Sequence, residues 1–257
     1  VYRQAVAATL NDSPDRPSFL NNLGNGLRTR YDRTERMPDL EEAIDAFRQA
    51  AATTSKESPY LPSFLNNLGN GLHARYDRTG SMTDLEEAID AFRQAVATTP
   101  NGSPDWASRM NNLGNGLSTR YDRTSSMTDL AEAINVYRQS VAATPSDSTG
   151  LPRSLNNMGN GLRDLYTRNG LPADLAEAQS TYRNAIELGR EADHDTALTS
   201  ARNWGSWALE RHAWQEASGA YVHGFKVAEM LYRAQVLRSS KESWLRELRG
   251  MHSGAAY

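Results

Sequence analysis

Apolar residues recur at spacings of three and four along most of this chain. Leu20, Leu23 and Leu27 form one such stripe, and Leu40 and Ile44 begin another after a short polar stretch. This spacing places the apolar side chains on one face of an α-helix, because an α-helix turns once in about 3.6 residues. The pattern therefore predicts an all-α protein built from paired amphipathic helices.

The two stripes belong to sequence signatures that repeat with a fixed period. The first signature reads LNNLGNGL at 20–27 and returns, with small changes, at 65–72, 110–117 and 155–162. The second reads DLEEAIDAFRQA at 39–50 and returns at 84–95, 129–140 and 174–185. Each copy starts 45 residues after the one before it. Such repetition predicts a solenoid, in which each two-helix repeat buries its apolar face against its neighbours.

Two glycines stand inside the first helix of every long repeat. Gly24 and Gly26 interrupt a helical pattern, where each glycine costs about 1 kcal/mol relative to alanine. A cost repeated four times implies a compensating close approach of two helices, and we expect Gly24 where the two helices of one repeat pack. A nucleotide-binding loop is the weaker interpretation, because no strand precedes the pair and the third glycine of that motif is missing.

Polar residues before the stripes mark the expected helix starts. Ser13-Pro14 offers an N-cap followed by proline at the first helical position, and the same dipeptide recurs in each of the next two repeats. In the second repeat, Thr83 with Glu86 has the pattern of a capping box. These residues predict where the helices begin.

Charges along the second helix are interpreted as a solvated face rather than a docking site. Asp39, Glu41 and Glu42 crowd its first turn, where the positive end of the helix dipole favours acidic groups. Asp45 and Arg48 are three residues apart and are expected to pair on the solvent side.

The spacing inside each repeat resembles that of the tetratricopeptide repeat (TPR). That family has a large residue and a Leu-Gly pair on its first helix, then Ala, an aromatic residue and Ala on its second. Those positions are filled here by Leu20, Leu23-Gly24, Leu27, Ala43, Phe47 and Ala50. The departure is length, since a TPR has about 34 residues and the additional ones fall between the helices. A fifth copy, at Asn203-Trp204-Gly205, returns to ordinary TPR spacing.

The resemblance implies a TPR-like α-solenoid in which antiparallel helix pairs stack in a right-handed superhelix, with each first helix on the concave surface. We expect residues 1–257 to form one solenoid that begins with the end of a preceding repeat. Its expected parts are 1–10, the long repeats 13–55, 58–100, 103–145 and 148–190, a short repeat 195–225, and a helical extension 226–257. Within that extension, Ser239 and Glu242 suggest a last short helix that holds Trp244.

Two narrower resemblances suggest a biological setting. An Asn-Trp-Gly helix at Trp204, a Trp-x-x-Ala helix at Trp214 and a Trp-Leu segment at Trp244 are similar to the region that precedes CHAT domains, which are caspase-like proteases or pseudo-proteases. The wording LNNLGN also resembles the TPRs of kinesin light chains, which bind cargo peptides. These resemblances imply a sensor arm in a larger protein.

Composition narrows the function classes. The net charge of −3 gives no case for nucleic acid, whose binders carry basic patches, and the absence of cysteine excludes thiolate metal sites. No apolar run approaches the roughly 18 residues that span a membrane, and no signal peptide is visible, so we expect a cytoplasmic protein. None of the five histidines stands in a metal-ligand spacing, and no nucleophile elbow occurs. We therefore expect no cofactor, no metal and no enzymatic activity.

Asparagines provide the candidate binding site. On a helical wheel, the residues beside the apolar stripe of each first helix fall on one side, and stacking the repeats turns them into columns. An amide side chain both donates and accepts hydrogen bonds, so such columns suit the backbone of an extended peptide. The candidate peptide-binding residues are Asn21, Asn25, Arg28, Asn66, Asn70, His73, Asn111, Asn115, Asn156, Asn160 and Arg163.

A structural use of the same amides is the open alternative. Asparagines one repeat apart could bond to one another and hold the stack in register. A neighbouring column points further round the helix and suits that structural role better. Its members are Asn22, Asn67, Asn112, Asn157 and Asn203.

Three functions are therefore weighed. The favoured one is a non-catalytic scaffold that binds a peptide or protein on the concave face, and the alternative is self-assembly into homo-oligomers through open solenoid ends. An enzyme is the least favoured.

Two further expectations concern the C-terminal part of the chain. Trp204, Trp207 and Trp214 are expected in the core. Asp193-His194-Asp195 is expected to lie in an inter-helix loop and to cap a helix.

Overall fold

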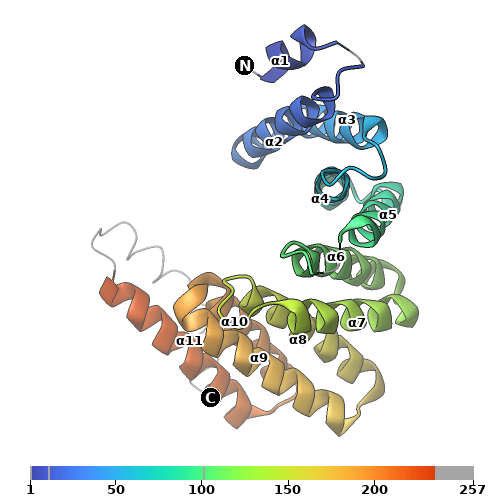
Figure 1. Ribbon diagram of the computed structural model, residues 1–257. Helices are drawn as coiled ribbons and strands as arrows, with labels where there is room; N and C mark the ends of the chain where they lie inside the picture. The colour runs from blue at the N-terminus through green and yellow to red at the C-terminus, as the bar shows by residue number, and fades with distance from the viewer. Residues whose placement is uncertain (1, 11, 101, 235–257) are drawn as a thin grey trace. The chain divides into compact units, whose positions relative to one another are not determined.

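The computed structural model describes residues 2–10, 12–100 and 102–234. Over these residues the chain forms helices and no strand, which confirms the all-α prediction. Eleven helices follow one another in Figure 1: α1 (Tyr2–Ala8), α2 (Arg16–Thr34), α3 (Met37–Thr53), α4 (Leu61–Thr79), α5 (Met82–Thr98), α6 (Trp106–Thr124), α7 (Met127–Ala143), α8 (Leu151–Asn169), α9 (Pro172–Ala192), α10 (His194–Glu210) and α11 (Trp214–Ala234).

The helices pack as pairs within two compact units, residues 1–129 and 130–257, which we describe separately. In the first unit α2 packs with α3 and α4 with α5, as Figure 1 shows, and α3 also contacts α4. In the second unit α8 packs with α9 and α10 with α11, and α9 also contacts α10. Each second helix is thus shared between its own partner and the first helix of the next repeat, as expected for stacked repeats.

The apolar stripes meet inside each pair. On α3, Ala43, Ile44 and Ala50 are fully buried, and Leu72 of α4 is fully buried as well. Burying a leucine or isoleucine side chain stabilises a fold by about 1.5–3 kcal/mol, and the small alanines allow the helix axes to approach. The core therefore runs along the line where first and second helices touch.

The first glycine of each signature lies where the two helices of a repeat cross. A Cβ atom at Gly24 would lie 2.5 Å from the ring of Phe47, and one at Gly69 would lie 2.5 Å from Phe92. Carbon atoms do not approach this closely, so the aromatic ring occupies the space that a side chain would need. The prediction that Gly24 marks the contact within a repeat is confirmed.

The second glycine faces the preceding repeat instead. A Cβ atom at Gly71 would lie 3.0 Å from Ile44 on α3, and one at Gly161 would lie 3.0 Å from Ile134 on α7. Two residues along an α-helix correspond to about 200° of rotation, so the two glycines face opposite neighbours. One glycine pair thus allows close packing both within a repeat and between repeats.

The helix starts differ from the predicted ones. α2 begins at Arg16, and the Ser13 hydroxyl accepts a bond from the Asp15 amide in a turn just before the helix. A proline does stand in the first turn, but it is Pro17 rather than Pro14. In the second repeat the cap of α5 is Ser81, which accepts from the amide of Asp84, so the predicted capping box at Thr83 is wrong by two residues.

The last described pair resolves three expectations. Trp204 and Trp207 are buried as predicted, whereas Trp214 is 48% exposed, so its assignment to the core is wrong. Asp193 caps α10 by accepting from the amide of Thr196, which confirms the predicted cap, but the predicted loop is wrong because His194 and Asp195 already belong to α10. The expected boundary between 225 and 226 falls inside α11, and the short helix expected after Ser239 lies outside the described residues.

Candidate functional site

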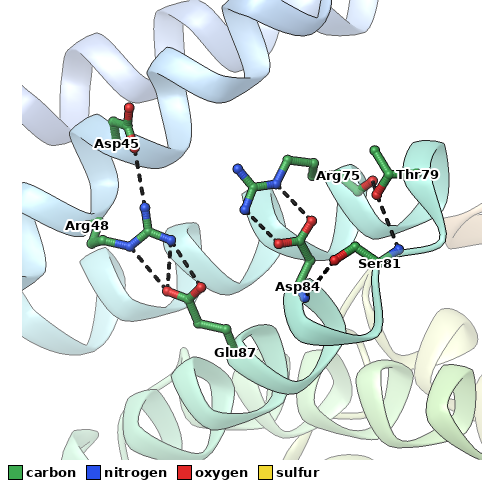
Figure 2. Close-up of polar contacts among 7 residues, drawn as sticks. All are labelled: Asp45, Arg48, Arg75, Thr79, Ser81, Asp84 and Glu87. Carbon is green, nitrogen blue, oxygen red and sulfur yellow. Dashed lines mark hydrogen bonds and ion pairs between the residues drawn. The ribbon is translucent and has the colours of Figure 1, made fainter.

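The loop between the helices of a repeat is held by a buried ion pair. In Figure 2, Arg75 near the end of α4 points at Asp84 in the first turn of α5, with Nε to Oδ2 at 2.8 Å and Nη2 to Oδ1 at 2.6 Å. The same bidentate pair joins Arg30 to Asp39, which is 3% exposed. Hydrogen bonding from Arg30 lowers the pKa of the Asp39 carboxyl below its ordinary value. The sequence pattern predicted a helix-dipole role for Asp39 and did not indicate its ion pair with Arg30.

A second set of ion pairs joins neighbouring repeats. Figure 2 shows the guanidinium of Arg48 on α3 donating to both carboxylate oxygens of Glu87 on α5, at 2.9 and 3.0 Å. The predicted pair between Asp45 and Arg48 is present at 3.3 Å and is confirmed. Bonding from Arg3 likewise lowers the pKa of the Glu42 carboxyl. This charged face holds repeats together through partly exposed ion pairs, each of which stabilises the stack only weakly.

Amide bonds link the first helices of the first unit. The Nδ2 group of Asn67 donates to Oδ1 of Asn21 at 2.9 Å, and Asn112 donates to Asn66 at 2.9 Å. The column that includes Asn67 and Asn112 was predicted to hold repeats in register, and these two bonds confirm that role. Asn21 and Asn66, which we predicted as peptide ligands, accept those bonds. The register bonds occupy one acceptor position on each.

The asparagines of the second unit lie in a closer network. Oδ1 of Asn156 accepts from Ser200 at 3.0 Å and from Asn203 at 3.3 Å. Oδ1 of Asn160 accepts from the Tyr182 hydroxyl at 2.7 Å and from Asn203 at 3.3 Å. The amide oxygens of both columns thus face protein donors here.

Arg163 is the last predicted ligand of the second unit, and it pairs with its neighbour. Its Nε donates to Oδ1 of Asp164 at 2.9 Å. Burial raises the pKa of the Asp164 carboxyl in spite of the favourable charge of Arg163. This arginine is therefore partly neutralised by a half-buried acid.

Four of the predicted residues come together around one pocket of about 370 Å³ in the first unit. Asn25 and Arg28 line it from α2, and Asn70 and His73 line it from α4. The remaining lining residues are Phe47, Asn67, Ala74 and Asp77. Asn111 and Asn115, on α6, are not among its lining residues.

The two basic side chains of the pocket are held in place. Arg28 donates to the Asp32 carboxylate at 2.9 Å and to the main-chain oxygen of Asn70 at 3.0 Å. His73 places Nε2 3.0 Å from the Thr119 hydroxyl and Nδ1 3.4 Å from the Asp77 carboxylate. Fixed side chains lose less conformational entropy when a ligand binds, which favours binding.

The pocket combines amide, guanidinium, imidazole and carboxylate groups with the Phe47 side chain. Such a wall offers both donors and acceptors, as a peptide main chain requires. Phe47 and Asp77 also line the pocket and were not predicted from the sequence. Asp77 could have been predicted, because it lies four residues after His73, one turn along the same helix, and is the equivalent of Asp32 in the preceding repeat.

Metal-holding groups and membrane-spanning helices were also sought among the described residues. Among residues 2–10, 12–100 and 102–234, no group of three or more acidic, histidine or cysteine side chains is placed to hold a metal ion. No helix within those ranges is long and apolar enough to cross a bilayer.

Comparison with known proteins agrees with this architecture. The family model described as tetratricopeptide repeat matches residues 18–51, 63–99 and 106–143. No curated protein sequence matches the chain.

Solved structures of low identity share the fold. A Podosopora anserina protein described as a kinesin light chain with nearly identical TPR-like repeats is 16% identical, with a TM-score of 0.54, 93% of this chain covered and 98% of that one. The TPR protein YrrB is 14% identical, with a TM-score of 0.55 and coverage of 96% and 98%. MamA is 14% identical, with a TM-score of 0.57 and coverage of 88% and 98%.

At these identities the likeness concerns the fold alone, while the matched segments identify the repeats themselves. Each matched segment begins within the first helix of a repeat and ends within one residue of the second helix or inside it. Residues 18–51, 63–99 and 106–143 are therefore tetratricopeptide repeats, and the fold is a TPR-like α-solenoid.

Proposed function

We propose that this protein is a non-catalytic scaffold that binds an extended segment of a partner protein along the first helices of its first unit. The observation that carries the proposal is the pocket of about 370 Å³ between α2 and α4, which brings Asn25, Arg28, Asn70 and His73 together. Paired amides suit a peptide main chain irrespective of its sequence, while Arg28 and His73 differ between repeats and would supply selectivity.

The comparisons support this choice of function by analogy. YrrB is described as a TPR protein with an unusual peptide-binding site, and the P. anserina protein as a kinesin light chain. Binding on repeat surfaces is a common use of solenoids, whose stacked elements present extended faces. The analogy favours a protein or peptide ligand over a small molecule.

A displayed library of random twelve-residue peptides tests the proposal. Peptides selected on the wild-type protein are expected to bind the double variant Asn25→Ala/Asn70→Ala about 30-fold more weakly, because two hydrogen bonds of about 1 kcal/mol each are lost. Titration calorimetry measures the affinity, and thermal unfolding checks that the fold persists.

Asn112→Ala is the matched control. This substitution removes an amide that bonds Asn66 outside the pocket, so it is expected to lower the free energy of unfolding by about 1 kcal/mol and leave peptide affinity unchanged. Failure to select any peptide, or equal binding by the double variant, would contradict the proposal.

Self-assembly is a second candidate, in which a second copy docks on α2. Gly26 of α2 is exposed beside a hollow of about 240 Å³. Tyr2 and Leu27 line that hollow. An aliphatic side chain of the second copy would fill it.

Light scattering distinguishes this candidate. Self-assembly through the hollow predicts a molar mass that rises with concentration and that Gly26→Lys returns to that of one chain, because the lysine would fill and charge the hollow. A single-chain mass at every concentration would remove the candidate without affecting the peptide proposal.

We also propose, more specifically, that the scaffold serves as the regulatory arm of a cytoplasmic CHAT-type protein. The support is the sequence resemblance at Trp204 and Trp214. The exposure of Trp214 fits a role outside the core, such as contact with an attached domain.

A further inference from the structure

The second helix places an aromatic ring on the first glycine in the repeats of Gly24, Gly69, Gly159 and Gly205, and the identity of that ring differs between repeats. Phe47 packs on Gly24 in the first unit, and Tyr182 packs on Gly159 in the second. The nearest ring carbon lies 2.5 Å from the position of an added Cβ in the first case and 2.9 Å in the second. The rings thus occupy equivalent places and differ by one hydroxyl.

Where the ring is tyrosine, its hydroxyl contacts the residue that directly follows the glycine. The Tyr182 hydroxyl donates to Oδ1 of Asn160 at 2.7 Å. The Tyr221 hydroxyl lies 3.3 Å from the hydroxyl of Ser206, which follows Gly205. Two independent repeats therefore show where the para position of the ring points.

Where the ring is phenylalanine, the same position faces an asparagine of the pocket. The residue that follows Gly24 is Asn25, and the residue that follows Gly69, on which Phe92 packs, is Asn70. Asn25, Asn70 and Phe47 all line the pocket. A phenylalanine ring has no hydroxyl, so neither Phe47 nor Phe92 donates a hydrogen bond to these amides.

We propose that this aromatic residue sets which repeats bind peptide: phenylalanine leaves the following asparagine available, and tyrosine engages it internally. The proposal rests on the proposed function. It adds a specificity-determining residue that does not itself form a hydrogen bond with the peptide. In an open repeat, a main-chain N–H of the extended peptide takes the place that the tyrosine hydroxyl takes at Asn160. Binding is then confined to the first unit, at Asn25 and Asn70.

The burial of the ring makes the arrangement selective. Phe47 is 2% exposed and Tyr182 is fully buried, so neither ring rotates away without losing its packing against glycine. Burial raises the pKa of the Tyr182 hydroxyl, which keeps it protonated as a donor. Asn160 also accepts from Asn203, so the closed state of that repeat has a second support.

Phe47→Tyr tests the inference, with the peptides selected from the twelve-residue library as the probe. The introduced hydroxyl is expected to bond Oδ1 of Asn25, to shift the side-chain amide signals of Asn25 in a ¹H–¹⁵N spectrum recorded without peptide, and to weaken peptide binding about tenfold. Tyr221→Phe is the matched control, because it removes the equivalent hydroxyl next to Ser206, outside the pocket, and leaves affinity unchanged.

The outcomes separate the two proposals. No peptide binding by the wild type would overturn the proposed function and this inference together. Peptide binding that is weakened in Asn25→Ala/Asn70→Ala but unchanged in Phe47→Tyr, with the Asn25 signals shifted, would overturn the inference alone. If Phe47→Tyr does not fold, Phe92→Tyr places the hydroxyl against Asn70 and decides the question in the same way.

Discussion

Gly24→Ala is expected to lower the free energy of unfolding by about 1–2 kcal/mol, the net of a packing cost and a smaller gain in helix propensity. On an open helix surface the same change would stabilise by about 1 kcal/mol, because alanine is the better helix former. Here the new methyl would lie 2.5 Å from the ring of Phe47, and overpacking of this kind typically costs about 1–3 kcal/mol. The ring has little room to give way, since it is buried between α2 and α4. Urea unfolding followed by circular dichroism measures the change.

Gly26→Ala is the matched control two residues along the same helix. Its methyl would meet only Tyr2, at 3.4 Å, which is an ordinary van der Waals distance. Gly26 is exposed, so this variant is expected to be unchanged or up to about 1 kcal/mol more stable than the wild type. Equal effects from the two alanines would show that helix propensity, and not contact with Phe47, determines the outcome.

The repeat period made much of the fold predictable. The regular spacing of apolar residues such as Leu20 predicted two helices in each repeat. Glycines at Gly24 and its equivalents, which disfavour a helix, predicted where those two helices touch. The wheel position of Asn67 correctly indicated a structural bond between repeats. These features depend on local geometry that an α-helix imposes on any sequence.

The exact helix starts were not predictable in the same way. Ser13 and Thr83 both fit a capping pattern, yet the helices begin beyond Ser13 and before Thr83. Several polar residues in each loop satisfy the local cap rule, and tertiary contacts decide among them. At α5, the chosen start brings Asp84 within reach of Arg75.

The candidate site was predictable in its chemistry but not in its extent. The helical wheel predicted the binding residues on each helix separately. The structure brings four of them together around one pocket, namely Asn25, Arg28, Asn70 and His73. The contribution of Phe47 depends on a second helix crossing the first at Gly24, which a single-helix wheel does not describe. The phenylalanine–tyrosine difference between repeats was visible in the sequence, but its meaning required the position of the hydroxyl beside Asn160.

Arg75→Leu is expected to lower the free energy of unfolding by about 3 kcal/mol. The change leaves the buried carboxylate of Asp84 without the two hydrogen bonds that Arg75 donates, and removing one partner of a buried pair costs about 3–5 kcal/mol. We take the low end because the Arg75 side chain is 25% exposed. Chemical unfolding in urea measures the loss.

The fourth repeat shows how the same loss is compensated. There Leu165 stands where the other repeats have arginine, and Asn169 stands where they have threonine. Asn169 donates to Oδ2 of Asp174 at 2.6 Å and accepts from the amide of Leu171 at 3.0 Å. One amide thus supplies a donor to the acid and also retains the backbone bond that the threonine makes elsewhere.

The double variant Arg75→Leu/Thr79→Asn transfers that solution to the second repeat. The asparagine is expected to donate to Asp84 and to keep the acceptor role of Thr79 toward the amide of Ser81, so roughly 1–2 kcal/mol of the lost stability should return. Thr79→Asn alone is the control and should change stability by less than about 0.5 kcal/mol, because Arg75 still holds the acid. A double variant no more stable than Arg75→Leu would mean that the loop needs the arginine for more than its bonds to Asp84. If Arg75→Leu leaves the free energy of unfolding unchanged, water reaches the Asp84 carboxylate and replaces the guanidinium.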